Sequence, residues 1–204
     1  MAEEVLERGD TYRIYTTDAQ ALAVPYLPMT DMHKRKDHGY FDLRDKPEAV
    51  AKIAEAQGQP GLTVFLEQVN AAGKGLMSVA CSVEAAKVRS GAAAPEGEDA
   101  PTDFIDSTVD ITFRTSELAN GENMLVVARR LMELRAAQPG EWASYDLGIR
   151  PFKSLFGVNN LAGINIRIRA MGTSEAQAWE NFNFHWTQLA AAVRKLKLVP
   201  PATN

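Results

Sequence analysis

The only cysteine of the chain, Cys81, is its single possible thiol nucleophile. It lies in an apolar run that alternates with small and polar residues, between Val79 and Val83, and no histidine is near it in the sequence. Reactive thiols need a basic neighbour or a helix N-terminus that favours the thiolate. A buried structural cysteine is the more common interpretation of this pattern, and catalysis or sulfur transfer by Cys81 is the alternative.

A second group of candidate ligands lies in the charged segment that includes His33 and His38. Three aspartates lie nearby in the sequence: Asp31, Asp37 and Asp42. A metal site is conceivable, because ligands on loops can have irregular spacing. However, the basic run of residues 34–36 opposes cation binding, so a solvated loop is the stronger interpretation.

Other motifs that would indicate catalysis are incomplete. Gly73–Gly75 lacks the longer glycine spacing of a phosphate-binding loop, and no Ser or Thr follows its lysine. Ser78, Ser82 and Ser116 have no nucleophile-elbow context. We therefore predict no enzyme activity, no metal and no cofactor.

The elements that position these residues follow from periodicity. Residues 109–114 and 164–169 alternate strictly between apolar and polar side chains, which is the pattern of a strand buried on one face. Arg114, Arg167 and Arg169 fall on the polar sides and form a local basic strip. Ordinary solvent-facing charge explains these three arginines equally well.

Further strands are predicted at 62–66 and 77–85, joined as a hairpin by a turn at 71–75. A weaker strand pattern covers 142–149. Apolar residues at helical spacing predict helices over roughly 47–57 and 121–137.

The longest predicted helix covers about 174–197 and carries an aromatic seam that includes Trp179, Phe182 and Trp186. Such a seam most often packs on the protein's own sheet, but it also suits docking against a neighbouring subunit.

The fold class is therefore α+β. We predict an antiparallel or mixed sheet of about four to five strands, helices packed on one face and a long C-terminal amphipathic helix. Residues 1–46 are predicted as an irregular arm in which residues 12–15 could form a short strand. Residues 47–199 are predicted as one domain with a mobile loop at about 90–104, and 200–204 as a tail. The loop is rich in Ala, Gly, Pro and Glu, which cannot bury enough apolar surface to order it.

Composition narrows the functional class. The 204 residues suit one domain, and the net charge of −4 argues against a general nucleic-acid binder. No apolar run approaches the roughly 18 residues that span a bilayer. The acidic first ten residues lack the features of a signal peptide. We expect a protein made and used in a cytoplasm, or carried out of it inside a larger particle.

The order of these elements resembles that of tail-terminator (tail-completion) proteins of tailed bacteriophages. Gly61–Leu66 is similar to their first core strand, and Cys81–Ser90 to the long second strand that runs into an arm. Met124–Met132 is similar to the helix after the third strand, and Gly157–Ile168 to the closing strand. The likeness covers about residues 47–171 and is one of pattern and order, without a diagnostic motif.

This resemblance implies a non-enzymatic subunit of a homohexameric ring in the virion. Such a ring caps the tail tube and meets the head–tail connector, and DNA would pass through its lumen without sequence-specific binding. The implied partners are copies of the chain itself, the tail tube protein and the connector proteins, with no membrane. The candidate interface residues are Arg114, Arg167, Arg169, Glu96, Glu98, Asp99, Trp179 and Trp186.

Two alternatives remain open. The stretch 76–88 also resembles the cysteine-bearing strand of small sulfur-relay proteins, in which Cys81 would be the carrier. That family needs a parallel sheet and an accessible thiol at a strand end, whereas Cys81 lies inside an alternating run. A ligand-binding module that uses the Trp179–Trp186 seam is the other alternative.

Overall fold

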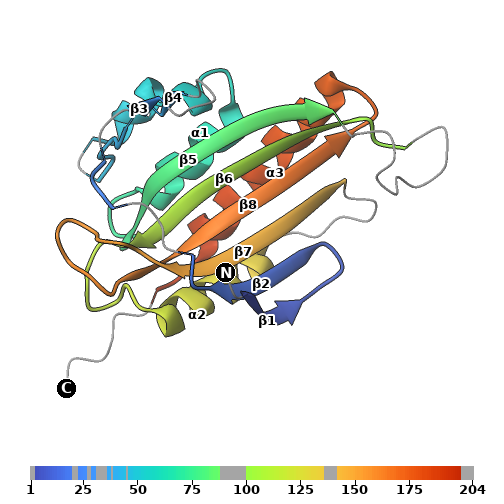
Figure 1. The fold of residues 1–204 in the computed structure, drawn as a ribbon. Coiled ribbons are helices and arrows are strands. Elements are labelled where there is room, and N and C mark those ends of the chain that lie inside the picture. The colour runs from blue at the N-terminus through green and yellow to red at the C-terminus, as the bar shows by residue number, and fades with distance from the viewer. Residues whose placement is uncertain are drawn as a thin grey trace.

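A six-stranded mixed sheet forms the centre of the protein, and three helices pack behind it (Figure 1). The computed structural model describes residues 3–19, 23–26, 29–30, 36–37, 39–44, 46–87, 100–135 and 142–198. The strands of this sheet are β1 (Glu3–Arg8), β2 (Tyr12–Thr17), β5 (Leu76–Lys87), β6 (Asp103–Phe113), β7 (Ala143–Pro151) and β8 (Ala162–Gly172). The helices are α1 (Pro60–Val69), α2 (Gly121–Leu134) and α3 (Glu175–Lys195), and the remaining elements are the strand pair β3 (Met29–Thr30) and β4 (Lys36–Asp37) with the 3-10 helices η1 (Pro47–Lys52) and η2 (Ala54–Ala56).

The strand order is β1-β2-β7-β8-β6-β5, and every neighbouring pair is antiparallel except β2 with β7. The predicted α+β class with helices on one face is confirmed. The sheet has more strands than the four to five predicted, because β1 and β2 come from residues that were predicted as an irregular arm. The prediction of an irregular arm is therefore wrong for β1 and β2, of which only residues 12–15 were expected as a possible short strand. The pairing of β2 with β7 joins segments about 130 positions apart, as Tyr12 opposite Tyr145 shows, and local periodicity cannot reveal it.

Alternation along β6 and β8 produces the two faces of the sheet, as predicted. Val109, Ile111 and the three isoleucines of β8 are fully buried on the helix side. Helix α3 lies across β8 and β6, and its Phe182 and Trp186 are also fully buried. The Trp186 indole Nε1–H donates to Ser107 Oγ at 3.1 Å, which fixes the helix against the middle of β6.

Helix α1 corrects one prediction. Residues 62–66, predicted as a strand, lie in the helix Pro60–Val69. Pro60 suits the first helical turn, and Leu62, Phe65, Leu66 and Val69 recur at a spacing of three to four and are buried. The turn at 71–75 therefore joins α1 to β5 and does not form a hairpin. The predicted helix at 47–57 is also replaced, by the 3-10 helices η1 and η2.

The hairpin of this fold is formed by β5 and β6, which pair from Leu76 opposite Phe113 to Lys87 opposite Asp103. Its connecting residues 88–99, which contain most of the predicted mobile loop, lie outside the described residues, as do 199–204. The strand and helix predicted at 142–149 and 121–137 are confirmed as β7 and α2, and the long C-terminal helix is confirmed as α3.

A small second layer covers part of the other face of the sheet. The segments 23–26, 39–44 and 152–161 meet there, with Val24 N donating to Ser154 O at 2.9 Å and Phe156 N to Val24 O at 2.6 Å. A Cβ added to Gly163 would lie 2.5 Å from the ring of Phe152, so this ring lies directly on β8. The rest of this face, which we call the open face, has no described element over it.

The contact between α1 and α3 gives a stability test. A Cβ on Gly61 would lie 2.1 Å from the backbone oxygen of Asn183 in α3. We expect Gly61→Ala to lower the free energy of unfolding by about 1 to 3 kcal/mol, because the helices must separate. Gly121→Ala is the matched control, since nothing lies within 4 Å of the added carbon. Urea unfolding followed by circular dichroism measures both, and equal effects would contradict this packing.

Candidate functional site

The open face carries arginine and aspartate side chains on neighbouring strands. Strand register places Arg167 of β8 opposite Asp146 of β7, and Asp146 opposite Arg13 of β2. One step along, Asp106 of β6 lies opposite Arg169 of β8. Opposite charges on adjacent strands are close enough to pair. We call these five residues the charge ladder.

Two arginines of the charge ladder each donate two hydrogen bonds to one aspartate. Arg13 donates through Nε to Asp146 Oδ1 at 2.5 Å and through Nη2 to Asp146 Oδ2 at 3.3 Å. Arg167 donates through Nε to Asp106 Oδ1 at 2.7 Å, and its Nη2 donates to the other oxygen. Arg169 adds a longer contact to Asp106, at 3.4 Å. Two parallel hydrogen bonds fix both partners more strongly than a single contact does.

A deeper pair lies beside the ladder. Arg150 of β7 reaches across to Asp110 of β6 with contacts of 3.2 and 2.5 Å, and Asn165 of β8 donates to the same carboxylate at 3.1 Å. The Asp110 side chain is only 8% exposed. Burial raises the pKa of Asp110, and the charge and hydrogen bonds of Arg150 oppose this effect without cancelling it.

The pKa of Asp106 is shifted in the opposite direction, downward. Burial by itself would raise its pKa, but the hydrogen bonds and charge of Arg167, with a contribution from Arg169, lower the pKa of this carboxyl below its ordinary value. The same pairing raises the pKa of Arg167. The carboxylate and guanidinium therefore stay charged and matched at neutral pH, which favours a structural role over proton transfer.

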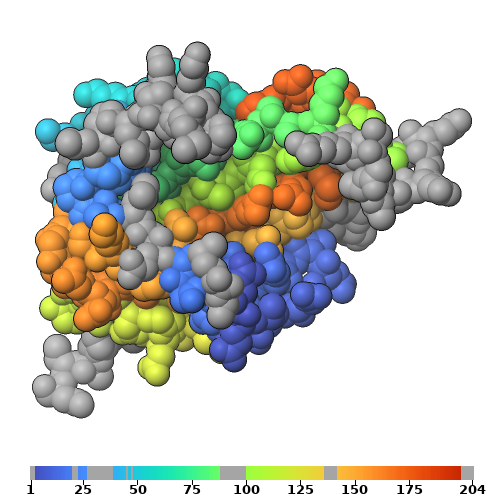
Figure 2. Space-filling model, in the orientation of Figure 1, coloured from blue at the N-terminus to red at the C-terminus, as the bar shows by residue number. Residues whose placement is uncertain are grey.

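Tyr15 of β2 lies flat beside the ladder. A Cβ on Gly148 of β7 would lie 2.8 Å from the Tyr15 hydroxyl oxygen, so the glycine makes room for the ring. The guanidinium carbon of Arg13 is 4.7 Å from the centre of this ring. The floor between β5 and β2 is a shallow depression of about 240 Å³, lined by Tyr15, Ser82, Glu84, Asp106, Ser107, Thr108, Asn165 and Arg167. Figure 2 shows β6 and β8 exposed there between β5 and the N-terminal strands.

The predicted basic strip is only partly brought together. Arg167 and Arg169 lie side by side on the open face, as expected. Arg114 lies apart from them, half-buried, and donates to the backbone oxygens of Leu76, Asn70 and Arg44 at 2.9, 2.5 and 3.3 Å. These contacts tie β5, the end of α1 and the 39–44 segment together, so the structure gives Arg114 an internal role.

The aromatic seam is a core feature. Trp186 is fully buried, with its ring centre 4.7 Å from that of Phe65, and half-buried Trp179 packs on Phe182 at 5.2 Å. The expectation of Trp186 as an interface or ligand-binding residue is therefore wrong. Glu96, Glu98 and Asp99 lie outside the described residues, and so do His33 and His38.

Sequence reasoning missed the paired aspartates of the open face. Asp106 and Asp110 are four residues apart in a strand, so they share one face, and this signal was readable. Their pairing with Arg167 and Arg150 depends on register, which the periodicity of single strands does not specify.

The two edges of the sheet differ. The first half of β5 is buried beneath the 39–56 segment, whereas residues Ser82–Lys87 are exposed or half-buried. Among the described strands, β5 pairs with β6 alone and β1 with β2 alone. Unpaired strand edges of this kind are templates for pairing with another chain.

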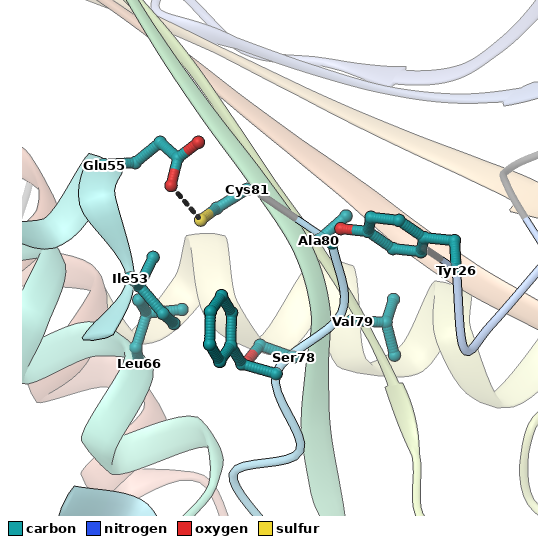
Figure 3. A pocket seen from close by; sticks show the side chains of 10 residues that line it. Tyr26, Ile53, Glu55, Leu66, Ser78, Val79, Ala80 and Cys81 are labelled. Atoms are coloured by element: carbon teal, nitrogen blue, oxygen red, sulfur yellow. Dashed lines mark hydrogen bonds between the residues drawn. The ribbon is translucent and has the colours of Figure 1, made fainter. Parts of the chain in front are cut away.

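Cys81 lies in the wall of a small cavity of about 30 Å³ between β5 and η2 (Figure 3). Its Sγ is 4.0 Å from Glu55 Oε2, and it points toward this carboxylate. The described residues that line the cavity include no Lys, Arg or His. A reactive thiol needs electropositive surroundings, whereas Cys81 lies beside the Glu55 carboxylate. The antiparallel pairing of β5 also differs from the parallel sheet that sulfur-relay proteins need.

Two further findings concern the described part of the chain. No helix there is long and apolar enough to cross a membrane. No group of three or more His, Cys, Asp or Glu residues there is placed to hold a metal ion. Comparisons with protein-family models, curated protein sequences and solved structures give no significant match to this chain.

The charge ladder makes stability depend on pH. Because the folded-state pKa of Asp106 is lowered, its ionised form stabilises the native state above the unfolded pKa of about 3.9, and this contribution is lost as the pH falls. We expect Asp106→Asn to cost about 1 to 2 kcal/mol at pH 7. That difference should shrink between about pH 5 and pH 2.

Denaturant unfolding at a series of pH values measures this dependence. Glu133→Gln is the control, because its carboxylate is 56% exposed in an ion pair on α2. A constant difference between Asp106→Asn and the parent at every pH would contradict the coupling.

The surroundings of Cys81 predict that its thiol reacts slowly. We expect an aromatic disulfide reagent to modify Cys81 more slowly in the native protein than in urea-unfolded protein, because the sulfur is partly buried beside a carboxylate. Reaction in the native state faster than that of free cysteine at neutral pH would instead support a catalytic thiol.

Proposed function

We propose that this chain is a structural subunit of a bacteriophage tail or neck, the subunit of the tail-terminator ring that caps the tail tube and joins it to the head connector. It acts by docking against other proteins and not by chemical turnover.

The observation that carries this proposal is the β5–β6 hairpin at the edge of the sheet. Its strands pair over eleven positions, from Leu76–Phe113 to Lys87–Asp103. The outer half of β5, Ser82–Lys87, pairs with β6 on one side, and no described strand pairs with its other edge. Natural sheets usually cover or charge such edges, and an edge left open favours assembly with a second chain.

The open face supports the same proposal. Each arginine of the charge ladder has a carboxylate partner on its own sheet. A matched surface of this kind does not attract nucleic acid through released counterions, which needs unpaired Lys and Arg. It suits a ring whose lumen lets DNA pass without holding it.

The order of elements supports the resemblance to tail terminators in part. After α1, the elements β5, β6, α2 and β8 follow the expected order of long strand, strand, helix and closing strand, and β7 is an additional strand before β8. The helix at Pro60–Val69 departs from it, because a strand was expected there. The proposal therefore rests on the hairpin and the edge more than on the N-terminal part of the likeness.

In a closed ring, the sheet edge of every copy can take part in a contact with a neighbouring copy. Head-to-tail contacts between identical subunits form a ring when the rotation closes, and closure leaves no subunit with a free surface. We propose a homohexamer in the virion, with the tail tube protein on one side and connector proteins on the other.

Negative-stain imaging of the purified protein, alone and mixed with tail tubes, tests the proposal. We expect closed rings, and an antibody against this chain should label the head-proximal end of tails in purified virions. Absence of rings in both samples, together with unlabelled virions, would refute the proposed function.

A further inference from the structure

The turn between β6 and α2 contains the only asparagine of the chain that is followed by a glycine, Asn120 before Gly121. Both residues are exposed, at the start of α2 (Figure 1). Nothing lies within 4 Å of a Cβ added to Gly121, so solvent reaches this stretch of backbone. The side-chain carbonyl carbon of an asparagine and the next backbone nitrogen can join in a five-membered ring. A glycine in the second position hinders this ring closure least, because it has no Cβ.

The backbone nitrogen of Gly121 is available for this reaction. Gly121 is the first residue of α2, and the first four N–H groups of a helix have no acceptor inside the helix. No hydrogen bond between described residues uses the Gly121 N–H. Solvent can therefore remove its proton without breaking a bond of the fold.

The other described asparagines lack this combination. Each is followed by a residue that has a side chain. Four of them also lie inside helices or strands, where the backbone is held in a regular conformation: Asn123, Asn165, Asn181 and Asn183. Asn120 thus differs from the rest in both the following residue and the accessibility of its backbone.

The Asn120 side chain is held by two hydrogen bonds in the cap of α2. Its Oδ1 accepts from Asn123 N at 3.0 Å, and its Nδ2 donates to Glu117 O at 3.4 Å. Ring closure requires this cap to open. An N-cap of this type is weak, so we expect it to slow the reaction only about fivefold relative to an unstructured peptide.

We propose that Asn120 is a site of spontaneous deamidation. The Gly121 nitrogen gives its proton to solvent and forms a bond to the side-chain carbonyl carbon of Asn120. The bond from this carbon to Nδ2 breaks, and the nitrogen takes up a proton and leaves as ammonia. Water then adds to either carbonyl carbon of the cyclic imide and opens the ring, which gives aspartate or isoaspartate. One water is consumed, one ammonia is released and nothing is oxidised or reduced.

The two products affect α2 differently. Aspartate keeps an acceptor oxygen for Asn123 N and places a negative charge at the helix N-terminus, where the helix dipole favours it. Isoaspartate instead routes the main chain through the former side chain and lengthens it by one carbon. The Asn120 carbonyl, which accepts from Met124 N at 3.0 Å, then leaves the main chain. The first turn of α2 therefore loosens at fully buried Met124.

Peptide mapping by mass spectrometry tests the modification after incubation of the folded protein at mildly alkaline pH. We expect residue 120 to accumulate the acid, with isoaspartate detected by an isoaspartyl methyltransferase. Gly121→Ala is the matched variant, because the added methyl group meets nothing and the helix is kept. It should slow the reaction at least about tenfold, because a Cβ hinders ring closure.

Three results would overturn the proposal. One is equal conversion in Gly121→Ala and the parent. Another is conversion of Asn123 as fast as that of Asn120. The third is a rate in the folded protein more than about a hundredfold below that of a peptide of the same sequence, because a helix cap cannot protect so strongly.

Urea unfolding of the separated products tests the consequence for α2. Anion exchange separates them from the parent, and Asn120→Asp supplies a pure reference for the aspartate form. We expect the isoaspartate form to unfold at a lower urea concentration than both the parent and Asn120→Asp. Equal midpoints for all three would refute the loosening of α2. Neither measurement depends on the ring proposed above.

Discussion

The burial of α3 against the sheet is the constraint on which the rest of the structure depends. Trp186 is enclosed by Phe65 of α1 and by Ser107 of β6, which accepts its indole hydrogen bond. Gly61 allows α1 to approach the backbone of α3 at Asn183. Because all three helices use one side of the sheet, the inward residues of β6, β7 and β8 are mostly apolar, and the inward Ser107 is satisfied by its hydrogen bond with Trp186. The other side is then left to polar residues and to whatever short segments can cover it.

The open face shows how a sheet keeps charges without making a reactive site. Asp106 and Asp146 each accept two hydrogen bonds from one guanidinium on a neighbouring strand. The pKa of Asp106 is lowered as a result, so it holds no proton to exchange near neutral pH. Asp110 is more buried and its pKa is raised, but Arg150 and Asn165 occupy its oxygens. Such pairs fix register across four strands, and a one-residue slip would separate all of them.

Sequence alone predicted the parts of the fold in which local pattern and tertiary packing agree. The alternation in β6 and β8 and the aromatic seam of α3 each had one dominant period, and each was confirmed. Residues 62–66 fit both a strand pattern and a helix pattern. The helix pattern becomes clear only when the whole run from Pro60 to Val69 is considered. For β2 the sequence offers only a possible short strand at residues 12–15, and local pattern could not predict its pairing with β7, far along the chain. The charge ladder is likewise a property of strand pairing, so the sequence indicates Arg167 and Arg169 but neither Arg13 nor the aspartates that pair with them. Trp186 was misassigned because helical spacing shows which residues share a face and not what covers that face.

The outer edge of β5 is the feature of one copy on which our proposal of assembly rests. Ordinary monomeric domains cover or charge the edges of their sheets. Here β5 pairs with β6 on one side only, and no described strand pairs with its other edge, where Ser82–Lys87 are exposed or half-buried. The open face differs from this edge, because each arginine of the charge ladder has a carboxylate partner on its own sheet. Paired guanidinium groups release few counterions when they meet a polyanion, so this face favours contact without tight binding.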